Sequence, residues 1–322
     1  MRRTATVLAI SAVFIVPCVA FADNVLELRS SFIEKYKNRL TITCDYTVDA
    51  AHKHPNPGSK DGDMHIAGRC SEVGLHMVAE IQNAKTAPEA MAEVHRVEGA
   101  ETTIPVTGVW RIWPEHAGNF DHIQQVGAGP EWTDPPPTNP PHVFEIHPVT
   151  QLAGHDLLPT LKAIPGFDPH AADEAFQRYE SASFEMAVAP KSHVRMHMQM
   201  VGYNYVTFVM ELVARDRVAP DGEFVYAAIR STDGDVLAHK KRIGFVKDSE
   251  PYRTEQSMTV GQCVTLLGIP RLDLALVSWR AGHAKSNPAA LKWSFPYEMV
   301  AVAVSGAPTD CATTYDNQDT PP

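Results

Sequence analysis

The chain has 322 residues and a formal net charge of −10. This acidic balance argues against nucleic-acid binding, because neutralisation of phosphates by Lys and Arg supplies most of that affinity, and the basic residues form no obvious patch. No apolar stretch after Ala22 approaches the length needed to cross a bilayer, so we expect no stable membrane insertion.

The N-terminus has the pattern of a secretory signal peptide. Two arginines precede an apolar run from Val7 to Ala20, and a small-x-small cleavage site ends at Ala22. A run this short does not serve as a permanent membrane helix. We therefore predict that residues 1–22 are removed by cleavage after Ala22 and that the mature chain is secreted or periplasmic.

Four cysteines follow the predicted signal peptide, an even number that suits disulfides in an oxidising compartment. Four cysteines allow three pairings. Cys44 and Cys70 fall in one predicted domain, whereas Cys263 and Cys311 fall in another. We therefore favour the pairs Cys44–Cys70 and Cys263–Cys311.

Five segments in the first half of the chain alternate apolar and polar residues, the period-two pattern of half-buried strands. Pro88 opens a short predicted helix at 89–95, because proline is tolerated where the amide has no partner. Three strands, a helix and two strands is the order of an OB-fold, a five-stranded Greek-key barrel. We predict an OB-like barrel over residues 23–152. Its expected strands are 40–48, 64–69, 75–81, 104–112 and 144–146.

Two motifs in this region carry a resemblance to a known group of domains. The segment from Val106 to Trp110 contains Gly-x-Trp, and the segment from Phe144 to Val149 contains Glu-Ile-His-Pro. In these motifs the region resembles secreted bacterial OB-like domains of uncharacterised function. The resemblance covers only residues 40–150, and it implies an OB-like fold without implying an activity.

Helical spacing returns after Val149 in two pieces, 157–163 and 171–179, and predicts a helical connection over 153–182. Beyond it, alternating segments and repeated turn signals predict a β-sandwich over 183–306. A polar tail follows at 307–322. The predicted fold is therefore mainly β: an OB-like barrel, a short helical connection and a β-sandwich. The sandwich strands are expected at 184–188, 194–201, 206–213, 224–229, 272–277 and 299–304.

The two longest loops of the predicted barrel are rich in histidine and carboxylate, and such loops often meet the ligand in OB-folds. Imidazole together with carboxylate suits zinc or another borderline divalent metal. The spacing matches no specific zinc signature. The alternative is that both loops are simply exposed to solvent and bind no metal. The candidate metal ligands of the first loop are His52, His54, Asp61 and Asp63, and the second loop holds Glu115, His116, Asp121 and His122.

The outer faces of the predicted barrel strands form a second candidate site. In the OB order the third strand lies beside the fifth, which would bring His76 and Glu80 near Glu145 and His147. These four side chains could bind a divalent metal or form an acid–base pair. The alternatives are ordinary cross-strand pairs on a polar face and a face that the helical connection covers. The whole outward set is His65, Arg69, His76, Glu80, Arg111, Trp113, Glu145 and His147.

A short methionine-rich segment lies in the predicted sandwich. Met196, Met198 and Met200 alternate with polar residues, and His193 lies just upstream. Methionine with histidine suggests copper(I), whose soft character suits thioether sulfur. Because the three methionines share one face of a strand, core packing is the favoured interpretation.

The sequence contains no Gly-x-Ser-x-Gly elbow, no His-Glu-x-x-His helix and no glycine-rich phosphate loop. We therefore expect an extracytoplasmic binding protein for a small molecule, a glycan or a protein partner. The alternatives are a metal-dependent hydrolase, with zinc or copper as the possible cofactor, and a purely structural envelope protein. The candidate ligand-binding residues at the barrel rim are Arg69, Arg111, Trp113 and Trp132.

Overall fold

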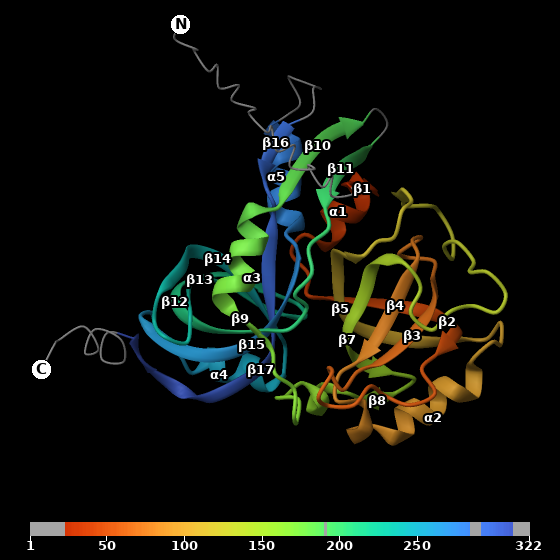
Figure 1. Cartoon of the computed structure of the whole chain (residues 1–322), viewed down its shortest axis with the longest axis horizontal. Helices are drawn as coiled ribbons and strands as arrows, with labels where there is room; N and C mark the ends of the chain where they lie inside the picture. Colours follow the sequence, from red (N-terminus) through yellow and green to blue (C-terminus); the bar gives the residue numbers. More distant parts are fainter. Residues whose placement is uncertain (1–22, 190–191, 284–290, 312–322) are drawn as a thin grey trace, which may run out of the picture.

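The computed structural model describes residues 23–189, 192–283 and 291–311. The predicted signal peptide and the end of the polar tail lie outside these residues. Two closed sheets lie side by side, and a third sheet extends from one end of the pair (Figure 1). The predicted mainly β class, with an OB-like barrel followed by a second β domain, is confirmed.

The first barrel is built from the five strands that the sequence pattern predicts. They lie in the order β4-β3-β2-β5-β7, and parallel pairing of β4 with β7 closes the sheet. The helix α2 (Pro88–Val97) connects β4 to β5, and β8 (His155–Asp156) extends the sheet beside β7. This is the arrangement of an OB-like barrel. The strands are β2 (Thr41–Ala51), β3 (Met64–Cys70), β4 (Met77–Ile81), β5 (Thr103–His116) and β7 (His142–Leu152).

Alternating apolar side chains fill the interior of the first barrel. Ile42, Tyr46 and Trp110 are each at most 1% exposed, so the predicted inward phase of β2 and β5 is correct. At Gly68 a Cβ atom would lie 2.2 Å from the carbonyl oxygen of Thr47, which explains a glycine at this close approach of two strands. The predicted disulfide Cys44–Cys70 is confirmed and joins β2 to β3.

The second β domain, predicted as a sandwich, is a sheet that closes on itself. Its order is β13-β14-β17-β15-β12, and pairing of β12 with β13 completes the ring. A short strand, β9 (His170–Ala171), adds to β12. The predicted disulfide Cys263–Cys311 is confirmed and ties β15 to the residue after β17. The strands are β12 (Val206–Ala219), β13 (Gly222–Arg230), β14 (Val236–Val246), β15 (Gln262–Leu272) and β17 (Tyr297–Asp310).

A third sheet gathers strands from distant parts of the chain in the order β16-β10-β11-β1-β6. Two segments predicted for the sandwich, 184–188 and 194–201, belong to this sheet instead. Met196 and Met198 are fully buried, in agreement with core packing, but Met200 lies past the end of its strand and is 39% exposed. The strands are β1 (Asp23–Arg29), β6 (His122–Ile123), β10 (Ser183–Ala189), β11 (His193–Gln199) and β16 (Leu291–Ser294).

The strand predicted at 272–277 was wrong, because most of this segment forms a helix. The side chain of Asp273 accepts a hydrogen bond from the amide of Leu276 at 2.8 Å, as a helix N-cap does. Leu274 and Val277, three residues apart, are the apolar positions that this helix buries. No helix among the described residues is long and apolar enough to span a membrane. The remaining helices are α1 (Ser30–Tyr36), α3 (Ala172–Ser181), α4 (Glu250–Gln256) and α5 (Leu274–His283), with short 3-10 turns at Ala84–Thr86 and Leu158–Thr160.

The two barrels share a buried interface that covers part of the outer surface of the first one. Arg271 of β15 donates hydrogen bonds to the carbonyl oxygens of Leu40 and Trp110. In the other direction, Arg111 of β5 donates to the carbonyl oxygen of Pro270 at 2.9 Å. Apolar side chains from both barrels and from the connection pack together beside these bonds, among them Leu40, Val109, Ile164, Tyr205, Phe224 and Val300.

Candidate metal centre

The register of three neighbouring strands gathers a set of polar side chains on the outer face of the first barrel. On antiparallel β3 and β4, His65 lies opposite Glu80. On parallel β4 and β7, Val78 pairs with Glu145, which brings Glu80 level with His147. The contact between the third and fifth strands was predicted, and it does bring Glu80, Glu145 and His147 together.

These side chains point away from the barrel interior, yet they are buried. His147 is fully inaccessible, and Glu80 and Glu145 are 3% and 2% exposed. The cover comes from the second β domain and from the connection between the domains, since Tyr205 contacts His147 on one side and Phe167 on the other. The predicted alternative that the helical connection covers this face is therefore correct in part.

Asp63 reaches the same cluster from the loop before β3. A tight turn fixes its position: the side chain of Asp61 accepts hydrogen bonds from the amide of Asp63 at 3.0 Å and from the side chain of Asn56 at 2.9 Å. Gly62, between the two aspartates, has a φ of 73°, which favours glycine. One residue of the candidate site predicted in the loop, Asp63, thus joins Glu80, Glu145 and His147 of the candidate site predicted on the strands.

His147 lies at the centre of the cluster. Its Nε2 atom is 2.7 Å from the hydroxyl oxygen of Tyr205 and 3.3 Å from Oδ2 of Asp63. Its Nδ1 atom is 3.5 Å from Oε2 of Glu80 and 3.5 Å from Oε2 of Glu145. Among the described residues, Nδ1 of His147 and Oδ1 of Asp63 are buried without any hydrogen bond. Buried polar atoms of this kind call for a specific explanation.

His142, at the start of β7, adds a second imidazole. Its Nδ1 atom is 2.6 Å from the carbonyl oxygen of Pro140. Because a carbonyl only accepts, Nδ1 carries the proton, and a neutral ring then presents the lone pair of Nε2. This Nε2 atom faces Oε1 of Glu145 at 3.2 Å. A ring nitrogen oriented by a backbone carbonyl on its other side is typical of metal-binding histidines.

Two overlapping groups have the proximity that a metal ion requires. One ligand atom from each of Asp63, Glu80 and His147 lies within 4.8 Å of the others, and the same holds for Glu80, His142 and Glu145. Glu80 belongs to both groups. Arg111 is hydrogen-bonded to Glu145 at the edge of the cluster.

The charges of the cluster shift the pKa values strongly. Burial raises the pKa of Glu80 well above its usual range, and it raises that of Asp63 as well. Burial opposes ionisation of Glu145 too, but the guanidinium of Arg111 and the contacts with His142 and His147 together outweigh it and hold the pKa well below normal. For His147 burial would lower the pKa, but Glu80, Asp63 and Glu145 raise it to about 10. Without a bound cation, protons balance the buried carboxylates.

Several predicted site residues lie outside this cluster. His76 precedes β4 and stacks on Trp132, with ring centroids 3.8 Å apart. His54 is exposed at the surface of its loop, whereas His52 is half-buried and stacks on His65. Arg111 and Trp113 are 0% and 1% exposed, and Trp113 packs against aromatic rings. They are therefore not at the surface, where a ligand-binding rim was expected.

Arg69 and Trp132, two predicted ligand-binding residues, line one surface cavity of about 290 Å³. Arg69 is held there by Asp49 at 2.9 Å and contacts Glu131 at 3.3 Å. The guanidinium is thus occupied by carboxylates of the chain itself.

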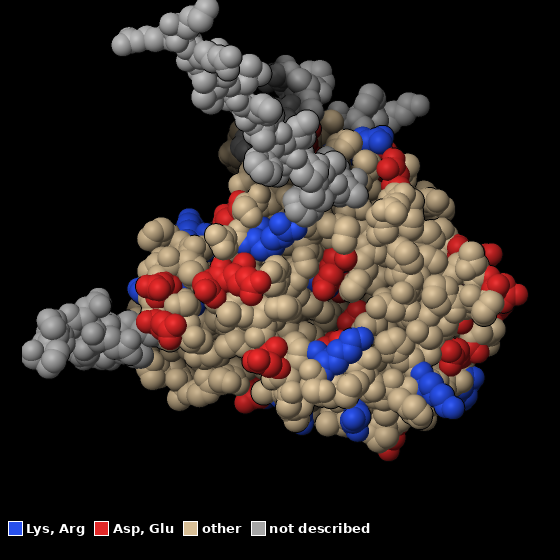
Figure 2. Space-filling model, in the orientation of Figure 1, with Lys and Arg blue, Asp and Glu red and all other residues tan. Residues whose placement is uncertain are grey.

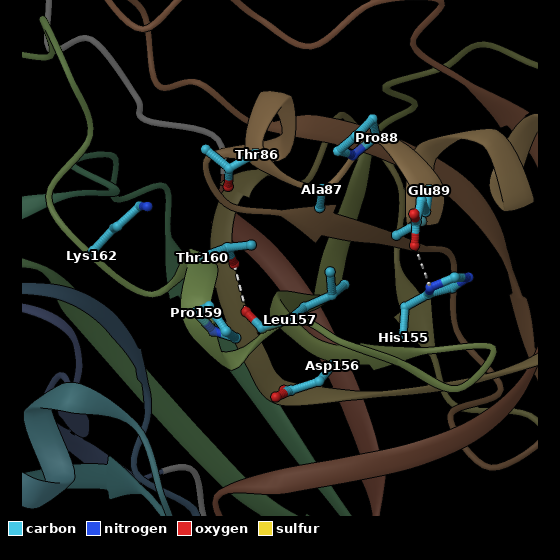
Figure 3. Close-up of a pocket in the computed structure, with 11 residues that line it drawn as sticks. Thr86, Ala87, Pro88, Glu89, His155, Asp156, Leu157, Pro159, Thr160 and Lys162 are labelled. Carbon is cyan, nitrogen blue, oxygen red and sulfur yellow. Dashed lines mark hydrogen bonds and ion pairs between the residues drawn. The ribbon is translucent and has the colours of Figure 1, made fainter.

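A larger cavity of about 470 Å³ lies between the N-terminus of α2 and the segment 155–162 (Figure 3). His155 and Glu89 face each other across it, with Nδ1 and Oε2 3.9 Å apart. The cavity carries both signs of charge, and none of its lining residues belongs to the cluster. On the face shown in Figure 2, Lys and Arg side chains are scattered among acidic ones and form no continuous patch.

Two contributors to the cluster, His142 and Tyr205, were not predicted from the sequence. His142, Glu145 and His147 form a His-x-x-Glu-x-His spacing that could have drawn attention to His142. Tyr205 had no such signal, because it belongs to the second β domain. Comparison with known protein families finds no family model that matches the chain, and no curated protein matches it.

Proposed function

We propose that this protein binds one divalent metal cation in the buried cluster of Asp63, Glu80, His142, Glu145 and His147. The ligand of the expected extracytoplasmic binding protein is then a metal ion. Two disulfides support an oxidising compartment.

The spacing around Nδ1 of His147 carries this proposal. Its two carboxylate neighbours lie at 3.5 Å, which is long for a hydrogen bond. Zinc binds nitrogen and oxygen ligands at about 2.1 Å in tetrahedral geometry, so neighbouring ligand atoms are about 3.4 Å apart. Nδ1 of His147 is therefore as far from these two carboxylate oxygens as neighbouring ligand atoms of one ion are from each other.

The hydrogen bonds of His147 also support a bound metal ion. The hydroxyl group of Tyr205 donates to Asp63, so its oxygen is free to accept from Nε2 of His147. With the proton on Nε2, a neutral His147 directs the lone pair of Nδ1 toward Glu80 and Glu145. An outer partner that fixes the tautomer in this way raises the affinity of a histidine for metal.

Charge balance supports a divalent ion. With neutral histidines, the ionised carboxylates of Asp63, Glu80 and Glu145 face the single guanidinium of Arg111, and all four groups are buried. Burying uncompensated charge is costly. One divalent cation offsets the two remaining negative charges, and carboxylates with imidazoles suit Zn²⁺ better than the softer copper(I).

Burial favours binding over hydrolysis. A catalytic zinc keeps an open coordination position for water or substrate, but the five side chains of the cluster, which supply the candidate ligands, are at most 3% exposed. A substrate therefore has no access to the cluster in this conformation, and the hydrolase alternative has less support than a binding role.

The test is metal binding by the mature chain. After treatment with EDTA and dialysis, titration with Zn²⁺ followed by calorimetry and metal analysis should show one ion per chain. Glu80→Gln keeps the shape of the side chain but removes the charge that both ligand groups share, so binding should weaken at least tenfold. Glu101→Gln, at a side chain that is 91% exposed, is the matched control. A folded wild-type chain that takes up no Zn²⁺ refutes the proposal.

A further inference from the structure

The buried cluster raises the question of how an ion reaches it. Every proposed ligand is closed off from solvent, so a cation must pass other side chains to enter and to leave. Two pairs of histidines extend from the cluster toward partly exposed positions.

The first pair is His52 and His65. Their rings are stacked, with centroids 4.5 Å apart and an interplanar angle of 22°, and the amide of His52 donates to the carbonyl oxygen of His65 at 2.9 Å. His52 is half-buried, whereas His65 is 6% exposed. The stack therefore begins at the surface and ends in the interior.

The inner end of this stack meets the cluster at its shared ligand. Nε2 of His65 lies 3.6 Å from Oε2 of Glu80, and Glu80 belongs to both groups of possible ligands. Among the described residues, Nδ1 of His65 is buried without a hydrogen bond. The side chain thus offers nitrogen atoms that no strong interaction occupies.

The second pair, His116 and His142, is a poorer path for a cation. Their ring centroids are 5.3 Å apart, and Nδ1 of His142 is bonded to the carbonyl oxygen of Pro140 at 2.6 Å. The charged neighbours of His116 are Glu115, Glu145 and Arg111. On the side of His52, the charged neighbours of the ring stack are Glu80 in the interior and, near His52, the exposed Lys60 together with Asp61. The charges therefore do not distinguish the two pairs, whereas the closer and more nearly parallel stacking of His52 on His65 does.

We propose that His52 and His65 pass the cation between solvent and the buried centre, each imidazole serving as a transient ligand. This inference rests on the proposed function. Because a route lowers the barrier in both directions, it changes the rates of uptake and release but not the equilibrium affinity.

The experiment measures the release of Zn²⁺ from the loaded chain to excess EDTA, and its uptake by the metal-free chain, in a stopped-flow instrument. His52→Phe keeps an aromatic ring stacked on His65 but removes the ring nitrogens. His52→Ala removes the ring and its nitrogens together. In both variants we expect uptake and release to slow on the order of tenfold, about 1.4 kcal/mol in the barrier, with the Kd unchanged. His54→Ala, in the same loop but outside the stack, should match the wild type.

The outcomes separate the two proposals. If the wild type binds Zn²⁺ and both His52 variants keep its rates, the ion uses another path and the route is refuted while the centre stands. Faster exchange in His52→Ala would show that the ring only obstructs the path, and a weaker Kd would make His52 a ligand; either result overturns the route. A wild type that binds no Zn²⁺ removes the centre itself, and the route with it.

Discussion

The hydroxyl group of Tyr205 donates a 2.7 Å hydrogen bond to Oδ2 of Asp63, although the two residues belong to different β domains. Tyr205 precedes β12 of the second barrel, and Asp63 precedes β3 of the first. Both side chains are at most 1% exposed. The contact therefore completes the polar cluster with a group from the second domain, and it makes the docking of the barrels part of the site.

Replacing Tyr205 with Phe should weaken this contact without creating a large cavity. The variant leaves Asp63 and His147 without their shared partner, and a buried polar group left unsatisfied costs about 1–3 kcal/mol. We expect the free energy of unfolding in urea, measured on metal-free protein, to fall by that amount. Tyr203→Phe is the control, because Tyr203 bonds Glu174 at the surface. Equal losses of unfolding free energy in the two variants would show that the buried hydrogen bond contributes no more to stability than the surface one.

The first barrel was predictable because its sequence signal is local. Each strand alternates apolar and polar residues. The order of strands and helix is that of an OB-fold, in which the third strand lies beside the fifth. The position of Glu80 near Glu145 and His147 followed from that order alone. His76 was misplaced because β4 begins only at Met77, so the alternation starts two residues before the strand.

The burial of the cluster could not be predicted from local patterns. Outward residues of a strand are polar in most solvated sheets, and the cover here comes from Tyr205, 142 residues from Asp63 in the sequence. The second half of the chain shows the same limit. The apolar residues of 272–277 suit a strand or a helix, and the N-cap at Asp273 decides between them.

Arg111 should be among the least replaceable residues of the cluster. It is buried, pairs with Glu145 and donates to the carbonyl oxygen of Pro270. Arg111→Met leaves the carboxylate of Glu145 buried without its cation, and the loss of one partner of a buried ion pair costs about 3–5 kcal/mol. Denaturant unfolding should show this loss. Arg195→Met, at a side chain 40% exposed, should change stability by less than about 1 kcal/mol.

The double variant Arg111→Met/Glu145→Leu provides the check on this explanation. Removing both charges should recover part of the stability lost in Arg111→Met, because two apolar side chains carry no desolvation penalty. If the double variant is less stable than Arg111→Met, shape rather than unpaired charge accounts for the effect.

Asp221 should make the interface between the barrels sensitive to acid. Its Oδ2 atom accepts hydrogen bonds from the side chain of Arg39 and from the amides of Leu40 and Thr41, at 2.9 to 3.1 Å. Burial would raise the pKa of Asp221, but the bonds from Thr41 and Arg39 outweigh it and lower the pKa below the usual 3.8. The stabilisation is therefore present above pH 3.8 and is lost as the pH falls through the lower pKa of the folded state.

Asp221→Asn should lower the free energy of unfolding at neutral pH by about 2 kcal/mol, because hydrogen bonds to a charged group contribute about 1.5–3 kcal/mol. The difference from the wild type should shrink as the pH falls below 3.8. Urea unfolding across this range measures it. A difference that stays constant with pH would mean that the ionised form of Asp221 contributes nothing.

His76 should destabilise the first barrel in mildly acidic solution. Burial, and to a smaller degree the neighbouring His122, lower its pKa from 6.5 to about 4, so the folded state keeps the ring neutral against Trp132. As the pH falls from 6.5 toward 4, the unfolded chain binds a proton that the folded chain does not, and stability decreases. His76→Phe retains an aromatic ring for stacking but cannot titrate. The variant should therefore lose less stability than the wild type between pH 6.5 and 4, as measured by thermal and urea unfolding.

His54→Phe, at an exposed position of another loop, controls for the added apolar ring. An unchanged pH dependence in His76→Phe would place the acid sensitivity of this region in other groups.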